Sequence, residues 1–224
     1  MKNVLFISLV MMALSISTNA QEERNYNVSI ESRNLSIKYA IQADKIIDKG
    51  LVKESFPIIS KAILTDSTQR KSYDILYRAC LVGQNYNDSL MRYFFIAKRI
   101  FDADDEICYK IAELYKMRKE YKKSIKHYSK AIELIANKEE KSKLTLQYYS
   151  GRAYCYVMTN MYKQAIPDYS VYLDENPDDA VILTNRGVCY QNDNNKEKAI
   201  ADWKKASGLG NSTAKAYLNR ITRK

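Results

Sequence analysis

The segment LQYYSGRAYCYVMTNMYKQAIPDYSVYLDENPDD, residues 146–179, is followed directly by AVILTNRGVCYQNDNNKEKAIADWKKASGLGN, residues 180–211. Small, aromatic and turn-forming residues recur in the two segments at a spacing of 34 positions. The recurring pairs are Ala153 and Gly187, Tyr156 and Tyr190, Ala165 and Ala199, Tyr169 and Trp203, and Pro177 and Asn211. A helix-turn-helix unit of this length cannot bury its apolar face alone and must stack on copies of itself. The spacing therefore predicts a helical solenoid.

The same register extends upstream through three further units. A small residue opens the second helix of each unit, and a large apolar or aromatic residue follows four positions later. The small residues are Ser55, Ser89, Ser124, Ala165 and Ala199, and the large ones are Ile59, Tyr93, Tyr128, Tyr169 and Trp203. Twelve positions before the small residues, on the first helices, stand Ala43, Tyr77, Ala112, Ala153 and Gly187. Spacings of three and four keep side chains on one helix stripe, so we expect these residues to form the core.

This pattern resembles the tetratricopeptide repeat (TPR) family over about residues 36–210, and Gly187, Tyr190 and Trp203 of the last unit match it best. Tyr77 stands where the family prefers Gly or Ala, and the family's early tryptophan is missing. The resemblance implies an all-α fold, a right-handed α-solenoid of about five helix-turn-helix units with a C-terminal capping helix. The units would span about residues 36–69, 70–104, 105–145, 146–179 and 180–210, with the cap over 211–224.

Two stretches depart from the regular spacing. The small residues of the third and fourth units are 41 rather than 34 positions apart, and the additional residues fall in Ile135–Lys143. This stretch lacks Gly and Pro, so we expect two extra helical turns there. After the last unit, Ala214, Tyr217, Leu218 and Ile221 lie on one helical stripe. This stripe predicts a capping helix that covers the fifth unit.

The first twenty residues have the pattern of a secretory signal peptide. Lys2 precedes the apolar run Val4–Ile16, and small residues stand near Ala20. The run is short for a membrane span. We expect cleavage near Ala20, a polar N-terminal segment over residues 21–35, and an exported protein that is periplasmic or secreted. An uncleaved anchor stays the alternative, and no integral membrane segment is expected in the mature chain.

Export raises the question of whether the four cysteines form disulfides. Cys155 and Cys189 occupy equivalent places in adjacent units. Equivalent positions of stacked helix pairs lie about 8–10 Å apart, whereas a disulfide needs Cα atoms within about 7 Å. We therefore expect both thiols to be reduced and buried, and pairing of Cys80 with Cys108 stays open. The chain has one histidine and no paired-cysteine spacing, so no metal site and no cofactor is expected.

Catalytic residues are not indicated. His127 stands among lysines and is expected on the exposed surface, without a partner or oxyanion site for nucleophilic catalysis. The acidic pairs Asp104-Asp105 and Asp178-Asp179 fall at helix starts, where carboxylates cap backbone amides. We therefore predict that this protein is not an enzyme.

The formal net charge is +10, and it stays at +9 without Lys2. The densest basic stretch is Lys116–Lys130. It is either a solvated helix face or a surface for an anionic partner. Nucleic acid is not expected, because the chain has a predicted signal peptide and its aromatics lie on packing stripes. The alternative function is a structural envelope-associated component that binds anionic partners through its basic outer helix faces.

In the TPR family the first helices line a concave groove that binds a peptide or partner protein. The resemblance thus implies an exported interaction module or adaptor, with its oligomeric state open. A chaperone-tail clamp is not expected, because only Asn185 fits the family's pattern for it. The candidate partner-binding residues off the packing stripe are Tyr109, Lys110, Glu113, Lys116, Ser150, Tyr154, Val157, Thr184, Asn185, Val188 and Gln191.

Overall fold

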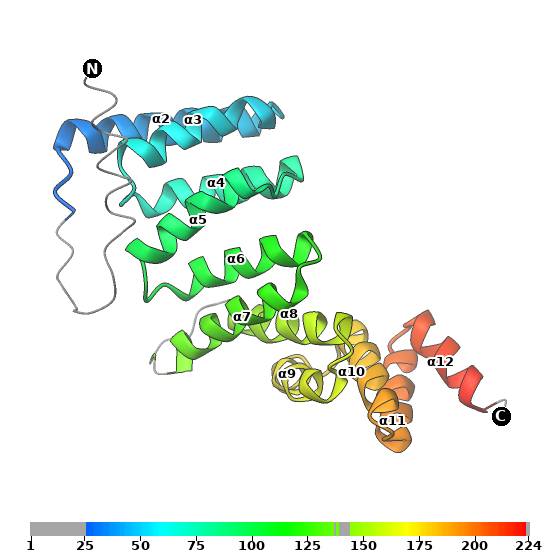
Figure 1. Ribbon diagram of the computed structural model, residues 1–224. Coiled ribbons are helices and arrows are strands. Elements are labelled where there is room, and N and C mark those ends of the chain that lie inside the picture. The colour runs from blue at the N-terminus through cyan, green and yellow to red at the C-terminus, as the bar shows by residue number, and fades with distance from the viewer. Residues whose placement is uncertain (1–25, 137, 139–143, 223–224) are drawn as a thin grey trace.

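The structure is a computed structural model that describes residues 26–136, 138 and 144–222. Over these residues the regular structure consists of eleven α-helices, without a strand. They are α2 (Ile30–Asp48), α3 (Val52–Thr65), α4 (Arg70–Gly83), α5 (Asp88–Ile100), α6 (Asp105–Met117), α7 (Tyr121–Ala136), α8 (Thr145–Met158), α9 (Tyr162–Glu175), α10 (Ala180–Asn192), α11 (Lys196–Gly208) and α12 (Ser212–Thr222). The predicted all-α solenoid is confirmed, and Figure 1 shows its helices stacked from α2 to α12.

Five helix pairs, α2/α3 to α10/α11, form the units, and α12 follows the last pair. The second helix of one unit packs against the first helix of the next, as in α3–α4, α7–α8 and α9–α10. First helices also contact each other directly, in α2–α4 and α6–α8. We call the side of the array on which the first helices lie its concave side, and the side of the second helices its outer side.

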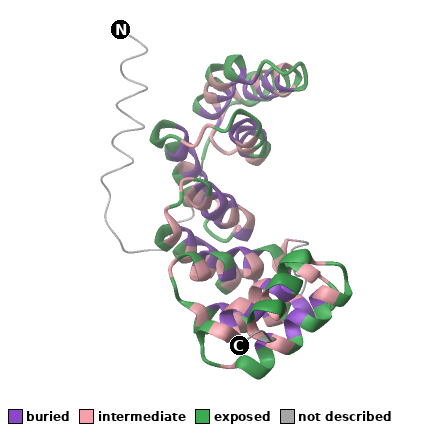
Figure 2. Ribbon diagram, turned by 90° about the vertical axis from the view of Figure 1, so that its right-hand side faces the viewer, coloured by how far each residue is buried: buried purple, intermediate pink, exposed green. Residues whose placement is uncertain are grey.

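The core runs through the whole stack instead of forming one central cluster. Buried residues extend along the array in Figure 2, and they form four consecutive clusters between α2 and α12. The predicted packing residues of four units are buried: Ser55 and Ile59, Ser124 and Tyr128, Ala165 and Tyr169, and Ala199 and Trp203. Because each unit packs mainly on its neighbours, stability is distributed along the chain.

The packing predicted for α5 in the second unit is wrong for Ser89 and confirmed for Tyr93. Ser89 is exposed, whereas Leu90, Tyr93 and Phe94 are buried at 6%, 8% and 0% exposure. The helix begins at Asp88, after Asn87, whose Oδ1 accepts a hydrogen bond from the Leu90 amide at 3.0 Å.

The buried residue Leu90 also stands eleven positions after the buried small residue of α4, instead of the twelve positions found in the other units. On α4 the fully buried small residue is Ala79, and Tyr77 is only partly buried. The left-handed residue that ends the helix is Gln84, five positions after Ala79. In the other units this residue comes seven positions after the small residue, at Gly50, Lys119, Asn160 and Asn194.

Two partly buried ion pairs, each bound to a serine of the preceding unit, join the third unit to the fourth and the fourth unit to the fifth. Arg152 on α8 binds Asp168 on α9 through two hydrogen bonds of 2.7 and 2.8 Å, and Ser129 on α7 through one of 3.0 Å. We name this arrangement the Arg–Asp–Ser clasp. The same contacts recur 34 positions later at 2.9, 2.9 and 3.0 Å in Arg186, Asp202 and Ser170. Bidentate arginine–carboxylate contacts fix both distance and angle between helices.

In the third unit, His127 stands at the position of the clasp aspartate. The expectation that it is exposed is wrong, because it is only 7% exposed. Its ring is stacked on Tyr115 at 5.5 Å and lies 6.0 Å from the ring of Phe95. Burial, together with the positive charges of Lys98 and Lys126, lowers the pKa of His127 to about 4. An aromatic contact therefore replaces the clasp between the second and third units.

The predicted continuation of α7 is wrong where the structure can test it. The helix ends at Ala136 and Lys138 is not helical, while residues 137 and 139–143 lie outside the described residues. The predicted signal peptide over residues 1–20 lies outside them as well. Over the residues that are described, no helix is both long and apolar enough to cross a membrane.

All four cysteines are buried, and their thiols are free. The burial predicted for Cys155 and Cys189 is confirmed. Burial raises the pKa of Cys80 and Cys189 to about 12 and that of Cys155 to about 11. Protonated, enclosed thiols of this kind act as small apolar residues.

Candidate functional site

The candidate groove residue Lys110 on α6 is held within the array. Its Nζ lies 3.0 Å from Asp74 Oδ1 on α4 and 3.5 Å from Glu106 Oε2. Arg70 on α4 joins the same network through Glu106 at 3.2 Å and through Asp104 at 2.5 Å. These ion pairs tie the second unit to the third on their concave side.

The other candidates on α6 also contact their own chain. Glu113 is buried and accepts hydrogen bonds from the Tyr128 hydroxyl and, at 2.6 Å, from Lys116 Nζ. The ring of Tyr109 lies 6.1 Å from that of Tyr128 and 5.1 Å from that of Tyr148. Burial raises the pKa of Tyr109 to about 12. The concave side of the third unit is thus largely occupied by internal contacts.

The candidates on α8 are more accessible. Tyr154 is 41% exposed, and its ring meets that of Tyr121 edge-on at 6.2 Å. Ser150 and Val157 are half-buried. Tyr154 therefore presents an aromatic surface on the first helix of the fourth unit.

The candidates on α10 divide into internal residues and cleft residues. Thr184 is buried and its hydroxyl donates to the Ala180 carbonyl at 2.6 Å, while Asn185 is half-buried. Val188 and Gln191 line a cleft of about 470 Å³ between α10, α11 and α12. Its other lining residues are Asn192, Lys196, Trp203, Tyr217, Arg220 and Ile221. We call this feature the C-terminal cleft.

The floor of the C-terminal cleft is aromatic. Trp203 is 2% exposed and is stacked on Tyr217 at 4.9 Å. Its Nε1 donates to the Thr184 carbonyl at 3.1 Å. Gly187 permits this position, because a Cβ there would stand 2.4 Å from Nε1. The small residue of the repeat thus places the indole under the cleft.

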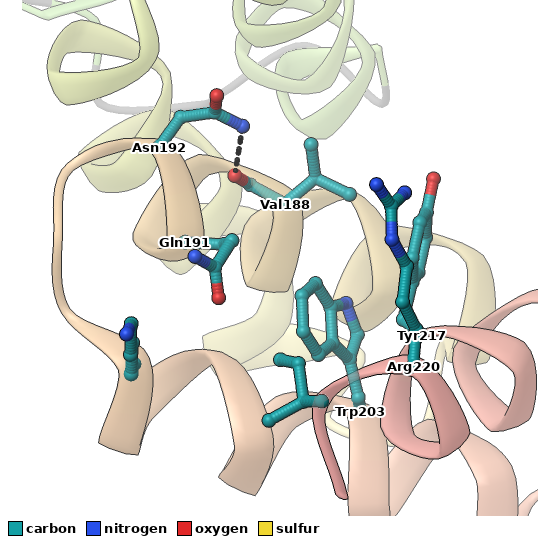
Figure 3. Close-up of a pocket in the computed structure, with 8 residues that line it drawn as sticks. Val188, Gln191, Asn192, Trp203, Tyr217 and Arg220 are labelled. Atoms are coloured by element: carbon teal, nitrogen blue, oxygen red, sulfur yellow. Dashed lines mark hydrogen bonds between the residues drawn. The ribbon is translucent and has the colours of Figure 1, made fainter. Parts of the chain in front are cut away.

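The rim of the cleft is positive. Lys196 begins α11 and Arg220 lies in the last turn of α12. Within the described part of the chain, neither has an acidic partner within ion-pair distance. The Oε1 atom of Gln191 is buried there and accepts no hydrogen bond. Figure 3 shows Val188, Gln191, Trp203, Tyr217 and Arg220 around the same space.

Metal-ligating side chains do not gather in the described residues, where no group of three or more His, Cys, Asp or Glu is placed to hold an ion. The only histidine, His127, is enclosed by aromatic rings in the core. The arrangement at the C-terminal cleft is suited to binding an extended ligand through apolar and charged contacts.

Neither a family model nor a curated protein matches this sequence. Solved structures match the fold. The MamA protein has a TM-score of 0.65 at 16% identity, covering 81% of this chain and 95% of its own. YrrB, described as a TPR protein with an unusual peptide-binding site, has a TM-score of 0.67 at 18% identity, covering 83% and 92%. This chain has a TPR fold. PilF of Pseudomonas aeruginosa also shares this fold, with a TM-score of 0.61 at 10% identity, covering 86% of this chain and 88% of its own.

Sequence reasoning about the TPR units missed the contribution of α11 and α12 to the cleft. Trp203 is a predicted core residue, which its 2% exposure confirms, and Tyr217 lies on the predicted stripe of the capping helix. Arg220 is not among the predicted binding residues. A signal for Arg220 was present, because it follows Arg152 and Arg186 at the same spacing of 34 positions.

Proposed function

We propose that this TPR protein is an interaction module that binds a peptide segment of a partner protein on its concave face. The observation that carries the proposal is the C-terminal cleft, which combines a concave shape with the stacked Trp203–Tyr217 floor and the rim cations Lys196 and Arg220. Aromatic residues and arginine supply much of the binding energy in protein interfaces.

The distribution of accessible residues also favours the C-terminal half of the concave side as the binding surface. On α6, Lys110 and Glu113 are engaged in internal ion pairs and hydrogen bonds. On α8 and α10, Tyr154 and Val188 are accessible and lie on neighbouring first helices. A bound segment would therefore extend from Tyr154 to the C-terminal cleft.

The proposal includes export, which is supported by the apolar run Val4–Ile16 after Lys2. The partner would then be a periplasmic or secreted protein.

The second candidate is a structural envelope-associated role through the basic outer face of α7. It is supported by Lys119 in the preceding turn and by Lys122 and Lys126 on α7, which are exposed and have no ion-pair partner among the described residues. The other cations of this stretch are paired within the chain. These are Lys116 with Glu113, Arg118 with Asp88 and Glu120, Lys123 with Glu120, and Lys130 with Glu133. These ion pairs reduce the excess of positive charge on this stretch, so we favour the concave face as the binding surface.

Photo-crosslinking in cells distinguishes the two candidates. A photoreactive phenylalanine analogue is placed at Tyr154 on the concave side or, as the matched control, at Val171, which is 37% exposed on α9. We expect one predominant protein adduct from position 154 and none from position 171. Adducts from position 171 alone, together with loss of binding in Lys122→Glu/Lys126→Glu, would favour the outer face.

A further inference from the structure

We infer that the C-terminal cleft recognises an acidic peptide segment, with a ligand carboxylate on Arg220 and an apolar side chain on the Trp203–Tyr217 floor. The inference rests on the proposed function, that the concave face binds a peptide, and specifies the chemistry of that peptide.

The repeat itself supplies the main argument. Arg152, Arg186 and Arg220 stand at equivalent positions of three successive first helices, each 34 residues after the last. The first two bind an aspartate through two hydrogen bonds of 2.7 to 2.9 Å. In the described residues Arg220 has no such aspartate, and it lines the cleft instead. A carboxylate from a ligand can take the place that Asp168 and Asp202 take in the two clasps.

Charge complementarity strengthens this assignment. Other arginines on the first helices are paired internally, as Arg70 is with Asp104 and Arg78 with Asp44. At the C-terminal cleft, Arg220 and Lys196 lie on the rim without a carboxylate among the described residues. Two unpaired cations around one concavity raise the local concentration of anionic ligands and disfavour basic ones.

The remaining lining residues favour a peptide over a small anion. The half-buried residues Tyr217, Val188 and Ile221 give the cleft an apolar surface for a side chain, and the enclosed Trp203 ring is stacked behind Tyr217. The carboxamide of Gln191 lacks a hydrogen-bond donor at Oε1, and a rotation of this side chain offers the oxygen to a ligand backbone N–H. A volume of about 470 Å³ accommodates a few residues of an extended chain.

The test is a selection of random nonapeptides by the chain from Gln21 to Lys224, followed by affinity measurements on the selected peptides. The wild-type chain is compared with Lys196→Glu/Arg220→Glu and with the control Lys215→Glu, which changes an exposed charge on α12 outside the cleft. We expect the wild type and the control to enrich peptides with Asp or Glu next to an aromatic or aliphatic residue. The double variant should enrich basic peptides and bind the wild-type selection at least about tenfold more weakly, because charge-assisted hydrogen bonds are lost.

The outcomes separate the inference from the proposed function. Enrichment of peptides without an acidic preference, or an acidic preference that persists in the double variant, overturns the inference and leaves peptide binding in place. A wild-type chain that enriches no peptide overturns both.

Discussion

Substitution of Gly187 by alanine is expected to destabilise the last unit, because the repeat places the indole of Trp203 directly against this glycine. A Cβ on residue 187 would stand 2.4 Å from Nε1 and 2.7 Å from Cδ1 of Trp203. Contacts this short force the ring to move. Its hydrogen bond to the Thr184 carbonyl, 3.1 Å long, would then be strained or broken.

Three effects determine the size of the change in the free energy of unfolding. Overpacking costs about 1–3 kcal/mol, and a buried donor left without its acceptor costs about 1–3 kcal/mol more. Alanine in a helix is favoured over glycine by about 0.5–1 kcal/mol, which offsets part of this loss. We expect Gly187→Ala to lower the free energy of unfolding by about 3 kcal/mol.

Gly208→Ala is the matched control. A Cβ at Gly208 meets no atom within 4 Å, and this residue ends α11 without a positive φ. The same chemical change should therefore leave stability unchanged or raise it by up to about 1 kcal/mol.

Urea unfolding followed by tryptophan fluorescence reports on the last unit, because Trp203 is the only tryptophan of the chain. Far-UV circular dichroism reports on all units together. Since stability in a repeat array is local, the fluorescence midpoint should fall more than the dichroism midpoint. If Gly187→Ala unfolds like Gly208→Ala with unchanged tryptophan emission, the close packing described for this unit is refuted.

Three further predictions concern the core and the cap. The pKa of His127 is lowered from 6.5 to about 4 in the folded chain, so the unfolded chain binds its proton first as the pH falls. The free energy of unfolding of the wild type should therefore fall by up to about 3 kcal/mol from pH 6.5 to pH 4. An equal fall for His127→Leu in urea unfolding over the same pH range would contradict this. Asp168→Leu should cost about 3 kcal/mol because it leaves the partly buried Arg152 guanidinium without its carboxylate. Arg152→Met/Asp168→Leu should recover much of that loss in thermal unfolding, and a double variant no more stable than the single one would argue against the clasp. Removal of residues 211–224 should cause aggregation in size-exclusion chromatography, since it uncovers the apolar side of the fifth unit, whereas a soluble, fully helical truncated chain would contradict a capping role.

The sequence predicted the architecture because the repeat spacing reflects packing. A small residue such as Gly187 stands where the aromatic ring of Trp203 on the next helix must fit. The prediction failed for Ser89 in the second unit, because the buried residues there are Ala79 and Leu90, eleven positions apart instead of twelve. A one-residue change in this spacing is not visible in the spacing of distant small residues.

The candidate site was harder to predict, because charge partners on neighbouring helices decide which residues are free. Lys110 lies on the first helix of its unit, as predicted, but Asp74 of the preceding unit binds it. His127 was misplaced because its lysine neighbours suggested a surface position. Alignment with Asp168, three positions after its own small residue, would have indicated that it faces the core.

A two-dimensional NMR titration of the chain with a peptide from the selection shows whether the concave C-terminal end is the binding face. Binding there should shift the backbone amides of α10 and α12 and the Trp203 indole N–H. Shifts confined to the outer helices α7 and α9, with α10, α12 and the indole unchanged, would contradict it.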